Sequence, residues 1–170
     1  PLAAWRAVTS TTLSFAHECF IDEMAHKANK DPFDLRLDML QKDTDTKRVM
    51  LKLKEVSQWS KPLPNGWARG VAQWEFFAGL AAQVVEVSKK PSGGLKIEKV
   101  YAVIDLGTVV NPDTVKAQVE GAITMAIGAA TKDGITFEKG QVQQSNFHDN
   151  RMVRMEEMPQ VEVYILAEGG

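Results

Sequence analysis

A proline- and glycine-rich break at residues 62–66 divides this sequence into two parts with different hydrophobic periodicities. Before the break, apolar residues recur at helical spacing, and after it they alternate or run continuously, as in strands. Helices followed by an antiparallel-looking sheet are typical of the α+β class. We therefore expect an α+β fold with N-terminal helices followed by a mostly antiparallel sheet with one packed helix.

Residues 1–60 are predicted to be mainly helical. The apolar residues of the first helix predict its buried face: Leu13, Ala16, Phe20 and Met24. Cys19 lies beside this face in the helical projection, and we expect it to be an inert core thiol. A hydroxyl from residues 10–12 is expected to cap the helix, and Asn29 to end it in a left-handed conformation.

Two further helices are expected before the break. Asp31 and Pro32 predict a helix start, because aspartate caps a helix and proline suits its first turn. The third helix follows residues 43–46 and carries a basic cluster: Lys47, Arg48, Lys52 and Lys54. This cluster is either a docking patch or a solvated helix face.

Residues 66–170 predict strands and a helix over 112–130. The expected strands are 68–76, 80–88, 95–98, 100–104, 135–137, 141–144 and 161–166. The continuously apolar run 100–104 is typical of a strand that is buried on both faces. Asn111, followed by Pro112, predicts the start of the helix, with Asn111 as its cap.

Composition and motifs exclude several classes of protein. The 170 residues suit one domain, and 20 basic against 22 acidic side chains argue against a dedicated nucleic-acid partner. No apolar run approaches the roughly 20 residues of a membrane span. One cysteine cannot hold an iron–sulfur cluster, and His17, His26 and His148 have no partners at metal-ligand spacing. We therefore expect no metal held by protein side chains.

Residues 103–112 form the one unusual segment, because they join a buried strand to a helix N-terminus, a usual place for binding anionic or polar ligands. The helix that follows is rich in small residues and carries Gln118, whose amide can recognise the edge of a heterocycle. The alternative is a tightly packed helix with a solvated Gln118.

The stretch from Tyr101 to Gly128, with its D-x-G-x-x-V-N-P and Q-V-E-G elements, resembles the molybdenum hydroxylases, the family of xanthine dehydrogenase and aldehyde oxidase. Other segments agree in the same order: the proline-aromatic-arginine loop 1–6, and residues 18–25, 68–72, 83–87 and 145–149. Residues 145–149, with Arg154 and Met155 after them, are most similar to the large (β) subunit of the isoquinoline 1-oxidoreductase type.

The resemblance implies that residues 1–170 are part of a second molybdopterin-binding domain. In this family molybdenum is held by the dithiolene of the pterin, and the enzyme hydroxylates an aldehyde or an N-heterocycle with oxygen from water. Trp5, Arg6 and Ala7 match the loop whose backbone approaches the pterin, and Gln118 matches the glutamine that contacts the cofactor near the metal. A bacterial member is expected to use the cytosine dinucleotide form of molybdopterin.

Two departures from the family pattern matter. Many relatives carry glycine or serine directly after the arginine and an aromatic residue at the second position beyond it. This sequence has Ala7 and Val8 at these positions, so the xanthine enzymes are no guide to the substrate pocket. The family's catalytic glutamate is expected after Gly170, and Glu168 is not that residue. Both ends look cut, so we expect a C-terminal fragment of a longer chain, with no catalytic residue of its own, no bound molybdenum and no activity in isolation.

The expected partners are the first molybdopterin-binding half of the parent chain and a [2Fe-2S] small subunit. Alone, the fragment is expected to self-associate through the apolar face that its partner normally covers. The alternative is a non-catalytic interaction or assembly module derived from the same family. No signal pattern is present, and the compartment stays open between bacterial cytoplasm and periplasm.

Overall fold

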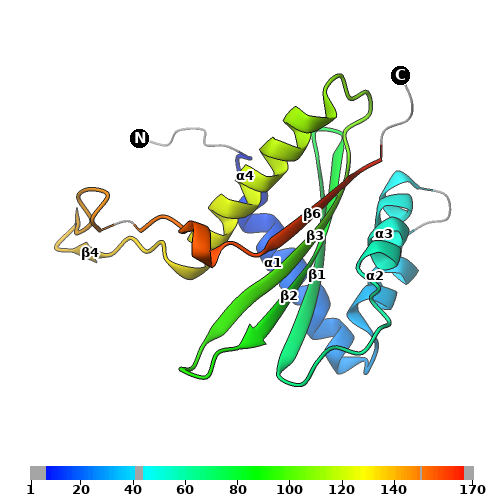
Figure 1. Ribbon diagram of the computed structural model, residues 1–170, viewed down its shortest axis with the longest axis horizontal. Helices are drawn as coiled ribbons and strands as arrows, with labels where there is room; N and C mark the ends of the chain where they lie inside the picture. The colour runs from blue at the N-terminus through cyan, green and yellow to red at the C-terminus, as the bar shows by residue number, and fades with distance from the viewer. Residues whose placement is uncertain (1–6, 41–43, 150, 167–170) are drawn as a thin grey trace.

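A four-stranded sheet forms the centre of the molecule and carries helices on both faces (Figure 1). The computed structural model describes residues 7–40, 44–149 and 151–166. In chain order the elements are α1 (Ser10–Lys27), α2 (Pro32–Met39), α3 (Asp45–Val56), β1 (Trp67–Phe76), β2 (Gly79–Lys89), β3 (Leu95–Asp105), α4 (Pro112–Thr131), β4 (Phe137–Glu138), β5 (Gln141–Val142), a 3-10 turn (Met155–Glu157) and β6 (Gln160–Ile165). The expected α+β class is confirmed.

The sheet has the strand order β1-β2-β3-β6. β1, β2 and β3 are consecutive antiparallel strands, with Trp67 opposite Ser88 in the first pair. β6 is parallel to β3, with Ile104 opposite Ile165. The sheet is therefore mostly antiparallel, as expected, and its parallel pair results from the long return through α4.

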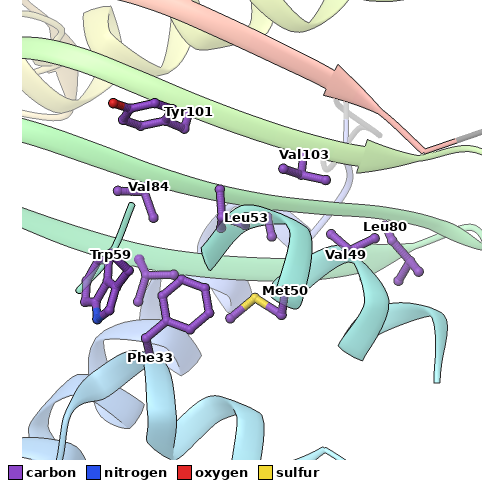
Figure 2. Packing of buried hydrophobic residues seen from close by; sticks show 11 residues of the cluster. Phe33, Val49, Met50, Leu53, Trp59, Leu80, Val84, Tyr101 and Val103 are labelled. Atoms are coloured by element: carbon purple, nitrogen blue, oxygen red, sulfur yellow. The ribbon is translucent and has the colours of Figure 1, made fainter. Parts of the chain in front are cut away.

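The larger core lies between the sheet and the helices α2 and α3 (Figure 2). Phe33, Met50 and Leu53 are fully buried there, and they pack against the sheet residues Val84 and Val103. Burying such side chains stabilises the fold by about 1.5–3 kcal/mol each. This core fixes α2 and α3 on one face of the sheet.

The smaller core lies on the opposite face, under α4. Ile123 and Ile127 of α4 pack with Val100 and Ala102 of β3. Because Tyr101 and Val103 face the larger core, β3 is buried on both sides over residues 100–105. The doubly buried strand expected from the apolar run 100–104 is confirmed, although it continues from Leu95 without interruption.

The predicted buried face of α1 is wrong. Leu13 and Phe20 are exposed, and the buried positions are Ser10, Glu18, Ile21 and Ala25. One residue corresponds to about 100° around a helix, so the face that meets the sheet is rotated by that amount from the apolar stripe. Cys19 is exposed rather than a core thiol. The apolar stripe of α1 therefore points away from its own core.

The helix termini agree with most of the expected signals. The Asp31 carboxylate accepts hydrogen bonds from Phe33 N at 2.8 Å and Asp34 N at 3.0 Å, and Asn29 has a left-handed φ of 50°. The hydroxyl cap expected for α1 is wrong, since α1 begins at Ser10 and the capping position, Thr9, makes no side-chain cap bond.

The region after α4 also differs from expectation. The strands expected at 135–137 and 141–144 are two-residue strands, β4 and β5, which pair with each other outside the main sheet. Because these strands are short and exposed, their sequences carry little hydrophobic patterning that could define where the strands end. Among the described residues, no helix has the length and apolar character needed to cross a membrane.

Candidate functional site

An open groove lies on the face of the sheet that α1 and α4 share. It has a volume of about 620 Å³, and α1 and the strands β1 and β2 line it. Phe15 and Cys19 border it on the helix side, and Ala72, Trp74 and Val85 form part of the sheet side. Val85 also packs in the smaller core, so the groove continues from the surface that α4 covers.

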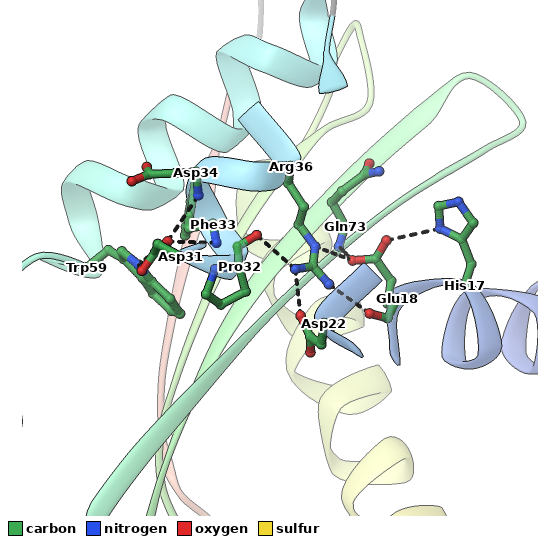
Figure 3. A network of polar contacts seen from close by, with 10 residues as sticks. All are labelled: His17, Glu18, Asp22, Asp31, Pro32, Phe33, Asp34, Arg36, Trp59 and Gln73. Carbon is green, nitrogen blue, oxygen red and sulfur yellow. Dashed lines mark hydrogen bonds and ion pairs between the residues drawn. The ribbon is translucent and has the colours of Figure 1, made fainter. Parts of the chain in front are cut away.

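A network of buried charges holds α1 against the sheet (Figure 3). Arg36 of α2 donates from Nε to Glu18 Oε2 at 2.8 Å, and from Nη2 to the Glu18 carbonyl at 2.9 Å. The same Glu18 oxygen accepts the backbone N–H of Gln73 in the edge strand β1 at 3.0 Å. No local sequence pattern marks this pair, because Glu18 and Arg36 lie 18 positions apart.

The groove floor contains one polar atom without a partner. Trp74 Nε1 is buried, and no residue in the described part of the chain accepts its hydrogen bond. Its ring meets the His17 ring edge-on, with centroids 5.8 Å apart. A buried indole N–H normally has an acceptor, so Trp74 marks a place where the described residues leave hydrogen bonding incomplete.

The connection from β3 to α4 is a turn that hydrogen bonds to a side chain hold in place. Gly107 has a φ of 68°, and its N–H donates to Asp105 Oδ1 at 3.0 Å. Arg48 of α3 binds the other oxygen of the buried Asp105 at 2.5 Å. The basic cluster of α3 is in part tied to acidic groups, since Lys52 pairs with Glu55 and Lys54 with Asp34.

The predicted Asn111 cap is present. Asn111 Oδ1 accepts from Thr114 N at 3.1 Å, and Pro112 occupies the first turn. The cap orients the amides at the start of α4, which carry the partial positive charge of the helix N-terminus. The sequence signal is sufficient here because the cap involves residues only three positions apart.

Gln118 lies on the exposed side of α4, and its amide has no hydrogen-bond partner in the described part of the chain. A side chain added at Gly121, one turn further on, would meet open space. By contrast, Gly128 is buried, and a Cβ added there would come into ordinary van der Waals contact with Asp133 and Val153 at 3.6 and 3.7 Å. The open part of the small-residue face is thus the part around Gln118 and Gly121.

The expected pterin loop is described only in part. Trp5 and Arg6 lie outside the described residues, whereas Ala7 and Val8 are exposed and have φ values of 61° and 48°. A left-handed backbone is a strained conformation for a β-branched residue such as valine. Strain of this kind persists where surroundings impose it, and it is concentrated at functional loops. No hydrogen bond within the described residues joins Ala7 to Gln118.

The segment 145–149 forms a closed turn. The backbone N–H and the hydroxyl of Ser145 both donate to Asp149 Oδ2 at 3.0 Å. The backbone hydrogen bond from Ser145 is the largest cause that lowers the pKa of Asp149. The turn leaves the Phe147 ring exposed at the surface.

In the part of the chain that the structure describes, no three histidine, cysteine or acidic side chains are placed to hold a metal ion. The exposed side of α4 carries the Gln118 amide together with the charged side chains of Asp113, Lys116 and Glu120. The described residues thus form an α+β domain with hydrogen-bonding groups on the exposed side of α4.

The model of the molybdopterin cofactor-binding domain matches residues 3–159, and the chain belongs to this family. It is 33% identical to the isoquinoline 1-oxidoreductase subunit beta of Brevundimonas diminuta over 95% of the chain and 21% of that protein. It is 28% identical to the membrane-bound aldehyde dehydrogenase [pyrroloquinoline-quinone] of Gluconacetobacter polyoxogenes over 95% of the chain and 23% of that protein.

Among solved structures, a Cu,Mo-CO dehydrogenase aligns with a TM-score of 0.49 and 26% identity, over 52% of this chain and 11% of that one. By the coverages given above for the two curated relatives, the chain spans about a fifth of their length.

Proposed function

We propose that this chain is the molybdopterin-binding portion of an oxidoreductase that hydroxylates an aldehyde or an N-heterocycle with water as the oxygen source. The match to the molybdopterin cofactor-binding domain over residues 3–159 is the observation that carries the proposal. The name of one relative indicates an N-heterocyclic substrate, and that of another an aldehyde. The second relative's name also includes a different cofactor, pyrroloquinoline-quinone. For this chain the family match favours molybdopterin.

The residues we assign to the cofactor are Trp5, Arg6 and Ala7 of the loop and Gln118 of α4. The strained backbone at Ala7 and Val8 supports a loop whose shape serves binding. The unpartnered Gln118 amide beside the open Gly121 supports hydrogen bonding to a flat group laid against α4. When bound, the molybdenum cofactor supplies the two-electron oxidation and the activated oxygen.

The rest of the site is assigned to neighbouring parts. We propose that the general base is a glutamate after Gly170, because activating a hydroxyl group for attack requires a base near the metal. We further propose that residues 1–170 belong to the second molybdopterin-binding domain, with the cytosine dinucleotide form of the cofactor. The first molybdopterin-binding half and a [2Fe-2S] small subunit are the proposed partners.

The test is Gln118→Ala in the complete enzyme. We expect lower molybdenum content by metal analysis, or lower turnover of an aldehyde or N-heterocycle with a dye acceptor, with an unchanged thermal melt. Glu120→Ala changes an exposed side chain on the same helix and serves as the control. Full metal content together with full turnover in Gln118→Ala would show that Gln118 is a solvated surface residue with no role at the cofactor.

The second candidate is a non-catalytic interaction module, which the exposed apolar stripe of α1 and its groove favour. The full open reading frame separates the two. A parent bearing the first cofactor-binding half supports the enzyme, and a parent that starts near Pro1 supports the module.

A further inference from the structure

A second hollow lies on the opposite face of the sheet, where α3 ends. It has a volume of about 460 Å³, within the range of small-molecule sites. The chain from Ser57 to Pro64 forms one wall, and the strand residues Trp67, Arg69, Glu86 and Tyr101 form the other. The hollow therefore shares no residues with the groove beside α1.

Glu86 is the unusual residue of this hollow. Only 8% of its surface is exposed, yet no residue in the described part of the chain donates a hydrogen bond to its carboxylate. The nearest cationic atom is Arg69 Nη1 at 3.8 Å. Glu18, which is buried to a similar degree, receives donors from both Arg36 and Gln73. The Glu86 carboxylate still opens into the hollow, since among the described residues Trp74 Nε1 is the fully buried side-chain atom without a partner, so a ligand in the hollow can donate to the carboxylate.

The nearby cations are engaged elsewhere. The Arg69 guanidinium donates to the carbonyls of Gln58 and Lys61 and lies 4.9 Å from the centre of the Trp59 ring. Trp59 is itself fixed, because its Nε1 donates to the Asp31 carboxylate at 3.0 Å. Turning Arg69 toward Glu86 would break these contacts, so the wall is preorganised and the carboxylate stays open.

Lys99, opposite Glu86 on β3, is engaged as well. It binds Glu162 Oε1 at 2.6 Å and lies 4.4 Å from the centre of the Tyr101 ring. Figure 2 shows Tyr101 and Trp59 at the same end of the larger core, and Tyr101 also lines the hollow. Arg69 thus forms a long ion pair with Glu86 but no hydrogen bond to it, and Lys99 is paired with Glu162.

The remaining lining selects the class of ligand. Trp67, Tyr101 and the prolines at 62 and 64 are flat or apolar surfaces that suit an aromatic ring. Arg69 already offsets part of the Glu86 charge, and Lys61 adds a second positive group to the rim, so a neutral N–H donor is favoured over a cation. Lys61 can also donate to a carbonyl oxygen on the same ligand.

We propose that this hollow binds a small neutral aromatic amide, whose N–H donates to the Glu86 carboxylate while its ring lies among Trp67, Tyr101 and the prolines. The site is independent of the cofactor face, and binding at it requires no molybdenum. The amide supplies the donor that Glu86 lacks in the described residues.

The test compares benzamide with acetophenone, which keeps the ring and carbonyl but replaces the amino group with a methyl group. Titrated into the ¹⁵N-labelled chain, benzamide should shift the resonances of Trp67, Glu86 and Tyr101 with a dissociation constant on the order of millimolar. Acetophenone should bind about tenfold or more weakly, because it makes no hydrogen bond to the charged group. Equal binding of the two would overturn the proposal.

Two further arms complete the experiment. Glu86→Met removes the acceptor at similar volume and should abolish the difference between the two compounds, whereas Glu75→Met, at an exposed β1 position, should preserve it. If Glu86→Met does not fold, the comparison of benzamide with acetophenone on the parent chain still tests the proposal. Benzamidinium binding tenfold more tightly than benzamide would show a cation site instead, and the absence of shifts at saturating benzamide would show that the hollow holds only water.

Discussion

The buried carboxylate of Glu18 and the guanidinium of Arg36 are joined by a 2.8 Å hydrogen bond between two helices that meet at the edge of the sheet. Arg36 also donates to Asp22 and to the Pro32 carbonyl, and Glu18 accepts from the free edge of β1. One pair thus ties α1, α2 and β1 together and sets which side of α1 faces inward.

Removing one partner of this pair should be strongly destabilising. We expect Arg36→Met to lower the free energy of unfolding by about 3–5 kcal/mol, because it leaves the buried Glu18 charge without its guanidinium partner. The double change Glu18→Gln with Arg36→Met should recover part of the loss. Lys52→Met, which removes an exposed pair with Glu55, should cost less than about 1 kcal/mol. Urea denaturation measures all three, and equal losses for Arg36→Met and Lys52→Met would contradict the assignment.

The Asn111 cap should contribute measurably to stability. Asn111→Ala removes the acceptor for Thr114 N and should cost about 1 kcal/mol. Asn111→Asp keeps an acceptor and should retain most of the stability, and Lys116→Ala controls for an exposed change on the same helix. A melt of Asn111→Ala that coincides with that of the parent would refute the cap.

The Cys19 thiol should be reactive in the folded chain. Because Cys19 is exposed and borders the groove, we expect one equivalent to react with Ellman's reagent without denaturant. The total thiol measured in guanidinium chloride provides the reference. A thiol that reacts only after the chain unfolds would show that Cys19 is buried in the core, as the helical projection predicts.

The acid stability of the chain should depend in part on Glu162. Hydrogen bonds from Lys99 at 2.6 Å and from the Tyr164 hydroxyl at 2.7 Å lower its pKa below the ordinary 4.5. A lowered pKa contributes stability that is present above about pH 4.5 and is lost as the pH falls through the folded value. Glu162→Gln should therefore lose less stability than the parent between about pH 6 and pH 3.

Carbon-detected NMR of the Glu162 carboxyl group checks this directly. Its titration midpoint should lie below 4.5 in the parent and rise in Lys99→Met, which removes the largest cause of the shift. A midpoint at or above 4.5 in the parent would contradict the expected direction.

The isolated chain should self-associate through the exposed stripe of α1. Phe15 is 73% exposed and Phe20 60% exposed, and the apolar groove lies next to them. Light scattering should give a dimer or larger species, and Phe15→Ser with Phe20→Ser should shift it toward the monomer. Phe147→Ser removes an exposed ring from the distant 145–149 turn and should leave the mass unchanged. A monomeric parent chain would show that the stripe does not bind a second copy.

Local signals predicted much of the fold. The Asp31 and Asn111 caps, the left-handed Asn29 and the strand run 100–104 were all predictable, because each depends on neighbours within a few residues or on a simple hydrophobic period. The family match agrees with the resemblance carried by residues 101–128.

Tertiary structure decided which face of each element is used. Glu18 and Arg36 are buried because two helices and a strand edge supply their hydrogen bonds, and that pairing rotates α1 away from its apolar stripe. Glu86 is enclosed by a strand neighbour and by the loop after α3. The sequence by itself determined the order of helices and strands and the helix starts at Pro32 and Pro112, since these rest on short-range hydrogen bonds and periodicity. The burial of charged groups was decided only by the folded chain, because it depends on contacts between residues far apart in the sequence.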